Sequence, residues 1–210
     1  MRFFHYYHCY TEFEQWKKIA DQHIDALIES NLDNALAGFK LGVVGSNANE
    51  VVKFFSKRLS TPVDLVAESP FGWEKVTLDA MQRQCNEWDY VLYAHTKGVS
   101  RKNTADVWRR QMTETVVDRW QECVNLLANY DAVGPFWLTP EVDPNWATPF
   151  FAGNFWWATS RYIQTLPSVN NNDRYDAERW LGLNNPSVVN YVPNKYISHT
   201  GTPPRDYLAW

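Results

Sequence analysis

The sequence lacks the features that would assign it to several common protein classes. Its three cysteines, Cys9, Cys85 and Cys123, are odd in number and too far apart for a zinc site or a C-x-x-C pair. No apolar run approaches the roughly 20 residues of a membrane span, and the first residues have no signal-peptide core. The G-x-S-x-G, H-E-x-x-H and P-loop patterns are also absent. We therefore expect a cytoplasmic protein with reduced thiols and no membrane span, outside the enzyme classes that those patterns mark.

Aromatic residues are abundant instead. Eleven Trp, eleven Tyr and eleven Phe make up 16% of the 210 residues. Most large rings belong to protein cores, but rings at a surface can stack on sugars or bases. The net charge of −4 gives no overall attraction to nucleic acid or anionic membranes. The composition therefore fits a globular protein whose ligand carries faces that aromatic rings can cover.

Strand-like and helix-like segments alternate through the first half of the chain. Their spacing predicts an α/β fold with a mostly parallel central sheet and helices on both faces. Ligands of such sheets bind beyond the carboxyl ends of the strands, so we interpret residues 1–100 as a nucleotide-binding half. The expected strands cover residues 2–10, 39–45, 62–68 and 89–94, and the expected helices lie between them.

The second half, residues 101–210, is expected to complete a single domain and to bind the acceptor or sugar. An irregular loop should interrupt it, because prolines are frequent in residues 136–148. The pattern predicts helices over 105–128 and 174–181 and strands over 131–135, 150–158 and 187–192, with a glycine bend in the second of these strands.

A basic segment follows the fourth expected strand. His95 and Lys97 stand at its carboxyl end, where they could neutralise a diphosphate. Arg109, on the next helix, could converge on the same anion. A solvated turn and a solvated helix face are the plainer interpretations. Gly45 and Glu68, at the ends of the second and third strands, would cradle a nucleoside.

Two further segments carry polar groups that suit a sugar. Asn154 can donate to and accept from sugar hydroxyls, and Trp156 should face the opposite side of a strand from Trp157. Asp176 and Glu178 are two residues apart on a short helix, so only one should point into a site. That carboxylate would serve as the general base, although acidic residues at a helix start also stabilise the helix.

Taken together, these segments resemble small GT-A-like glycosyltransferases of bacteria, phages and large viruses, distantly similar to the rhamnan-synthesis type. The resemblance covers nearly the whole chain and rests on the order of three blocks, His95-Thr96-Lys97-Gly98, Trp108-Arg109 and Gly153-Asn154-Phe155-Trp156-Trp157. It implies a GT-A-like fold and a nucleotide-sugar donor, with a UDP-sugar expected. Such enzymes usually hold Mn²⁺ or Mg²⁺ at an acidic D-x-D where His95-Thr96-Lys97 stands here. Lys97 would therefore replace part of the metal charge, and His199 would be the residue directed at a metal or diphosphate.

The working hypothesis is a glycosyltransferase whose acceptor is a surface glycan or a modified viral DNA base. Its donor site would use the seven residues named above, from Gly45 to Trp156, and Asp176 or Glu178 would take the acceptor proton. Two alternatives stay open. One is a non-catalytic carbohydrate-binding module with an aromatic platform, and the other is a nucleotide-binding regulatory domain.

Overall fold

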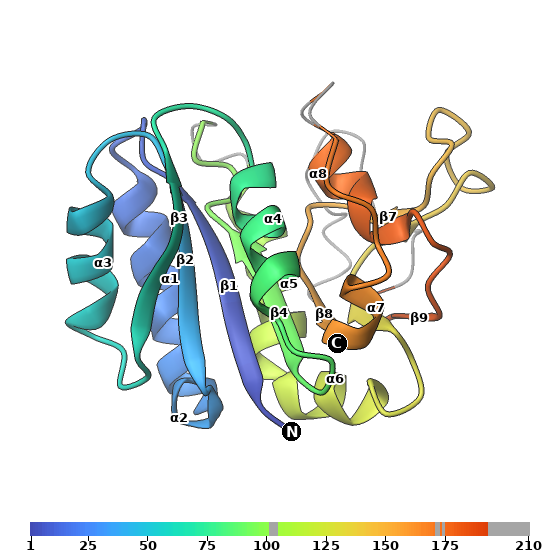
Figure 1. The fold of residues 1–210 in the computed structure, drawn as a ribbon, viewed down its shortest axis with the longest axis horizontal. Helices are drawn as coiled ribbons and strands as arrows, with labels where there is room; N and C mark the ends of the chain where they lie inside the picture. The colour runs from blue at the N-terminus through green and yellow to red at the C-terminus, as the bar shows by residue number, and fades with distance from the viewer. Residues whose placement is uncertain (101–104, 171–172, 174, 193–210) are drawn as a thin grey trace.

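The computed structural model describes residues 1–100, 105–170, 173 and 175–192. Its centre is a seven-stranded sheet in the order β3-β2-β1-β4-β8-β5-β9 (Figure 1). Four neighbouring strands are parallel, β8 is antiparallel to both of its neighbours, and β9 is parallel to β5. The expected mostly parallel sheet is therefore confirmed. The strands are β1 (Phe3–Tyr10), β2 (Gly38–Val44), β3 (Val63–Ser69), β4 (Tyr90–His95), β5 (Ala132–Gly134), β8 (Trp156–Thr159) and β9 (Val188–Asn190).

Helices cover both faces of this sheet, also as expected (Figure 1). One face packs against α1 (Trp16–Glu29), α3 (Ala48–Ser56), α5 (Asp106–Thr113) and α6 (Trp120–Leu126). The other packs against α4 (Lys75–Gln84), α7 (Ser160–Ile163) and α8 (Asp176–Arg179). The remaining elements are α2 (Leu32–Ala35), the π-helical η1 (Glu114–Asp118), the 3₁₀ turn η2 (Trp180–Gly182), and a small sheet of β6 (Trp137–Leu138) and β7 (Phe150–Phe151).

The strand β1 shows how the sequence produces this three-layer arrangement. Its residues are apolar or aromatic at nearly every position, which is typical of a strand covered on both faces. Tyr7 and Cys9 belong to the core on the α1 side, and Tyr6 belongs to the core on the α4 side. The helix α1 contributes buried residues such as Ile19 and Leu27, because residues about four apart share one face of a helix.

The predicted strand over residues 150–158 is wrong in one respect. The chain forms two strands there, β7 in the small sheet and β8 in the central sheet. Gly153 and Asn154 separate them with positive φ angles of 96° and 58°. A Cβ atom on Gly153 would lie 2.4 Å from Met112 Sδ, so only glycine lets the backbone pass so close to α5. The predicted helix over 105–128 is likewise divided, by η1 between α5 and α6.

A tight turn joins β4 to the segment that leads to α5. Thr96 fixes it to β1, because its backbone N–H donates to His8 O at 3.0 Å and its Oγ1 accepts from Tyr10 N at 2.9 Å. Val99 N donates to Thr96 O at 3.1 Å, and Gly98 has a φ of 80°. These bonds hold the segment at the carboxyl ends of the central strands. No helix of the described residues is long and apolar enough to cross a membrane.

Candidate functional site

A cleft of about 350 Å³ opens beyond the carboxyl ends of β1 and β4. We call it the strand-end cleft. These strand ends lie at the upper end of the sheet in Figure 1. Strand β1 contributes His8 and Tyr10 to the wall of the cleft, and the end of β4 with the following turn contributes residues 95–100. Residues just before and at the start of α4, together with α8, close the other side. Parallel α/β sheets generally bind ligands at this place.

Lys97 and Glu178 form the charged pair of the strand-end cleft. Lys97 Nζ lies 3.4 Å from Glu178 Oε1, and the two side chains are only 15% and 17% exposed. The ammonium group also lies 4.7 Å from the centre of the Trp108 ring, a cation–π contact. Burial alone would raise the pKa of Glu178, but the charges and hydrogen bonds around the carboxylate, with the charge of Lys97 foremost, together outweigh burial and hold the pKa below its ordinary value. Glu178 is therefore ionised at neutral pH.

Glu74 is a second carboxylate in the strand-end cleft, and it is not among the site residues predicted from the sequence. Its Oε2 accepts from Tyr93 OH at 2.8 Å and from Asn154 Nδ2 at 2.7 Å. Burial raises its pKa, and the nearby charge of Glu178 adds to the increase. The only sequence signal was an acidic residue at the start of a helix after a parallel strand, which ordinary helix stabilisation also explains.

His95 lies behind the charged pair as a neutral ring. Its Nε2 lies 3.0 Å from Gly153 O and therefore carries the proton that it donates, which leaves Nδ1 bare at 3.6 Å from Glu74 Oε1. Burial lowers the pKa of His95 to about 3, and the charge of Lys97 acts in the same direction. This geometry differs from the expectation that His95 offers positive charge to a diphosphate. Lys97 is the cation of this turn.

Arg109 also lies elsewhere than expected. It is 6% exposed, and it does not line the strand-end cleft. Its guanidinium donates to Lys97 O at 2.9 Å, to Gln22 Oε1 at 2.7 Å and to Asp106 Oδ1 at 2.8 Å. Because these three acceptors occupy its guanidinium group, Arg109 supports the backbone of Lys97 in this structure.

Asn154 and Trp156 are both about 1% exposed and do not shape the cleft wall. Trp156 stacks on Tyr93 with ring centres 5.1 Å apart, and its Nε1 donates to Asn154 Oδ1 at 2.7 Å. The amide of Asn154 then donates to Glu74. The two residues therefore form a buried layer that orients the Glu74 carboxylate.

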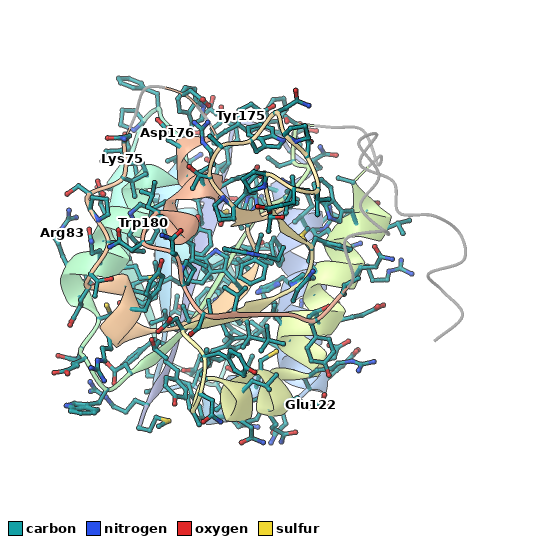
Figure 2. The ribbon with its side chains drawn as sticks, turned by 90° about the vertical axis from the view of Figure 1, so that its right-hand side faces the viewer. Lys75, Arg83, Glu122, Tyr175, Asp176 and Trp180 are labelled. Atoms are coloured by element: carbon teal, nitrogen blue, oxygen red, sulfur yellow. The ribbon has the colours of Figure 1, made fainter. Side chains whose placement is uncertain are left out.

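The two acidic residues of α8 point in different directions. Glu178 lines the cleft, whereas Asp176 Oδ1 accepts from Arg179 at 2.7 Å and Oδ2 accepts from the backbone of Asp173. Asp176 lies beside Tyr175 at the start of the helix, as labelled in Figure 2. A two-residue separation on a helix explains this divergence.

Gly45 and Glu68 do not line the strand-end cleft. Gly45 follows β2 with a φ of 110°, and a Cβ there would lie 2.5 Å from Glu12 Oε1. Glu68 is exposed near the end of β3. His199 lies outside the described residues. Among the residues that the structure describes, no group of three or more His, Cys, Asp or Glu side chains could hold a metal ion.

Exposed aromatic rings surround the mouth of the strand-end cleft. Phe13 and Trp73 line it and are 41% and 46% exposed, and Phe71, two residues before Trp73, is 80% exposed. Burying such rings against a flat partner is favourable. The cleft thus combines a cation, two carboxylates and a stacking surface.

Comparisons with known proteins agree on the fold. HddC from Yersinia pseudotuberculosis, solved with GMP-PN, is 11% identical with a TM-score of 0.54, and the match covers 100% of this chain and 97% of that chain. The 4-diphosphocytidyl-2C-methyl-D-erythritol synthase from Anaerococcus prevotii is 8% identical with a TM-score of 0.52, covering 97% and 92%. These matches confirm the expected α/β fold of the GT-A-like type.

Other comparisons limit what can be carried over. S. aureus TarS is 12% identical with a TM-score of 0.46, and the match covers 91% of this chain but only 58% of that chain. No curated protein matches the sequence. The family model that matches is described as Domain of unknown function (DUF8361), and it matches residues 3–179.

Proposed function

We propose that this chain, which belongs to the DUF8361 family, is a glycosyltransferase that moves a sugar from a nucleotide-sugar donor to an acceptor hydroxyl. The observation that carries the proposal is the Lys97–Glu178 pair beside Glu74 in a cleft at the carboxyl ends of parallel strands. The fold supports it, because structures of the same fold include a nucleotide-binding protein solved with GMP-PN.

Lys97 is the residue that meets the donor diphosphate. It is the only cationic side chain among the described residues that line the strand-end cleft, and a compact ammonium group suits phosphate oxygens. Trp73 and Phe13, at the mouth, offer ring faces to the nucleoside or the sugar. Gly45 and Glu68 lie outside the cleft wall, so the structure gives them no contact with a ligand held there.

Glu178 is the base in this proposal. The acceptor oxygen bonds to the anomeric carbon, the bond from that carbon to the diphosphate breaks, and the acceptor proton passes to Glu178. The diphosphate leaves with an added negative charge, which Lys97 stabilises. When Lys97 turns to the diphosphate, Glu178 loses the partner that lowers its pKa. Its proton affinity then rises, which makes it a stronger base when the donor is bound.

Glu74 serves a different purpose from Glu178. Tyr93 and Asn154 hold its carboxylate in one orientation, and such fixed acceptors suit sugar hydroxyls. The raised pKa of Glu74 makes it the less ionised of the two carboxylates. We therefore assign Glu74 to binding the transferred sugar.

A divalent metal, which the fold implies, does not fit the described donor set. The carboxylates of Glu74 and Glu178 are committed to Tyr93, Asn154 and Lys97, and no described group offers three metal ligands. In this proposal Lys97 therefore stabilises the charge of the leaving group.

The direct test is a panel of nucleotide diphosphate sugars, UDP-sugars first, with release of the nucleoside diphosphate as the readout. Oligosaccharides and hydroxymethylated DNA would be supplied as acceptors in separate arms, and a further arm would combine nucleoside triphosphates with sugar phosphates. Product from the first arms alone supports the proposal. Pyrophosphate release from the last arm alone would indicate nucleotidyl transfer instead. Absence of both nucleotide binding and turnover would contradict the proposal.

The exposed rings of Phe13 and Trp73 also favour a second candidate, a carbohydrate-binding module. Replacing Lys97 by Ala separates the two candidates. A module retains its sugar affinity after this change, whereas a transferase loses nucleotide affinity because the diphosphate no longer meets a cation.

A further inference from the structure

A second cavity, also about 350 Å³, lies between α1 and the segment formed by α5 and η1. We call it the helix cavity. It lies on the sheet face opposite α4, and only His95 lines both it and the strand-end cleft. Of its other residues, only Arg109, which supports the backbone of Lys97, bears on the proposed sugar transfer. The residues that argue for a ligand in the helix cavity have no part in that function.

Negative charge is concentrated at the rim of the helix cavity. Glu29, Glu114 and Asp118 line it, are exposed, and make no ion pair with other described residues. Burial raises the pKa of Glu114, and the charge of Asp118 adds to this; Arg110 and Arg119 oppose it. The three carboxylates outnumber Arg110 and Arg119, the two exposed arginines whose charges act on Glu114, and they repel one another.

The remaining charged side chains of the lining already form ion pairs. Asp25 pairs with Arg58, and Asp106 pairs with Arg109, which also lines the cavity. The uncompensated charge therefore belongs to the rim. A positively charged ligand would relieve the repulsion there.

A separate observation lies deeper in the helix cavity. Tyr7 lines it, is 0% exposed, and its hydroxyl has no hydrogen-bond partner within the described part of the chain. Its ring stacks on His23 with centres 4.7 Å apart. A buried hydroxyl without a partner is costly, so it indicates that a polar atom of a ligand belongs beside it. This observation is independent of the acidic rim.

The lining also distinguishes between kinds of cation. The described residues contain no group of three or more side chains placed to hold a metal ion. Ile19, Tyr7 and Phe155 instead give the cavity an apolar and aromatic wall, and aromatic faces attract organic cations.

We propose that the helix cavity binds a small organic ammonium compound. The carboxylates of Glu29, Glu114 and Asp118 hold its charge, the wall of Tyr7 and Phe155 holds its carbon body, and the Tyr7 hydroxyl meets its inner polar group.

Calorimetry with cadaverine as the probe tests the proposal on the full chain. We expect cadaverine to bind and pentanediol, its neutral counterpart of similar length, to bind at least about ten times more weakly, since one charge contact is worth a tenfold factor or more. Glu114→Gln should weaken cadaverine binding about fivefold. Glu87→Gln, which removes an exposed carboxylate outside the cavity, should leave it unchanged.

Tyr7→Phe is the second variant, because it removes only the hydroxyl and should leave the fold intact. We expect it to weaken cadaverine binding about threefold, by loss of one neutral hydrogen bond. The proposal is overturned if cadaverine fails to bind, if Glu87→Gln weakens binding as much as Glu114→Gln does, or if Mg²⁺ binds with the same dependence on Glu114. It is also overturned if Lys97→Ala abolishes binding, because the ligand would then occupy the strand-end cleft.

Discussion

The strand-end cleft and the helix cavity meet at His95, yet they treat polar groups in opposite ways. In the cleft, Lys97 is paired with Glu178, and Glu74 is held by Tyr93 and Asn154. In the cavity, the Tyr7 hydroxyl and the rim carboxylates have no such partners among the described residues. Groups that are already placed at the site suit catalysis, because only the Lys97–Glu178 contact has to change when the donor binds. Groups without partners suit binding, because the ligand supplies the opposite charge or the hydrogen-bond partner.

The largest expected effect belongs to Glu178. Replacing it by Gln removes the base without changing the shape of the side chain, so kcat should fall by about 10²–10⁴-fold. Unfolding stability and nucleotide affinity should change little. Steady-state kinetics with the best donor checks this, with Glu87→Gln as the matched control. Equal losses in the two variants would contradict the assignment.

The role of Glu178 also predicts how activity depends on pH. Lys97 lowers the pKa of Glu178 in the free protein, and activity is lost as the pH falls through that pKa. Binding of the donor draws Lys97 away, so the acid limb of kcat should lie at higher pH than that of kcat/KM. Superimposed limbs would mean that Lys97 and Glu178 do not act as a coupled pair.

Lys97→Ala should have the next largest effect, about 10²-fold or more on kcat/KM, because a leaving diphosphate then meets no cation. Lys57→Ala, at the exposed end of α3, is the matched control. Cadaverine binding should survive in both variants, which sharpens the contrast between cleft and cavity. Turnover that is unchanged by EDTA in the wild type would agree with Lys97 supplying the charge.

The buried histidines give a prediction on stability. Burial lowers the pKa of His5 to about 3 and that of His8 to about 4, so both are neutral in the folded chain. In the unfolded chain they gain protons below about pH 6.5. Stability is therefore complete above that value and falls as the pH decreases, by about 2 kcal/mol for each histidine at about pH 5. Urea unfolding at both pH values measures the loss, and His8→Gln should reduce it.

The smallest effect concerns Tyr7. Because its hydroxyl makes no hydrogen bond with the described residues, Tyr7→Phe should leave the free energy of unfolding unchanged or raise it by about 1 kcal/mol. Tyr93→Phe is the contrast, since its hydroxyl donates to Glu74. That change should lower stability by about 1–2 kcal/mol. Equal urea midpoints for the two variants would contradict the view that the hydroxyl in the cleft has a partner and the hydroxyl in the cavity has none.

The sequence by itself determined the fold class, a mostly parallel sheet with helices on both faces. Alternating segments predicted a parallel α/β core, and the turn at His95–Gly98 was expected at a strand end because periodicity is a local property. The different orientations of Asp176 and Glu178 also followed from helix spacing alone.

Only the tertiary structure decided which side chains meet. Glu74 and Asn154 are eighty residues apart and touch because β8 enters the sheet beside β4. Arg109 supports the Lys97 turn from behind, although its charge alone suggested a ligand. The division of residues 150–158 depended on the close approach of Met112 to Gly153. Contacts between segments that are far apart in the sequence depend on how the elements pack together. A local sequence pattern does not determine that packing.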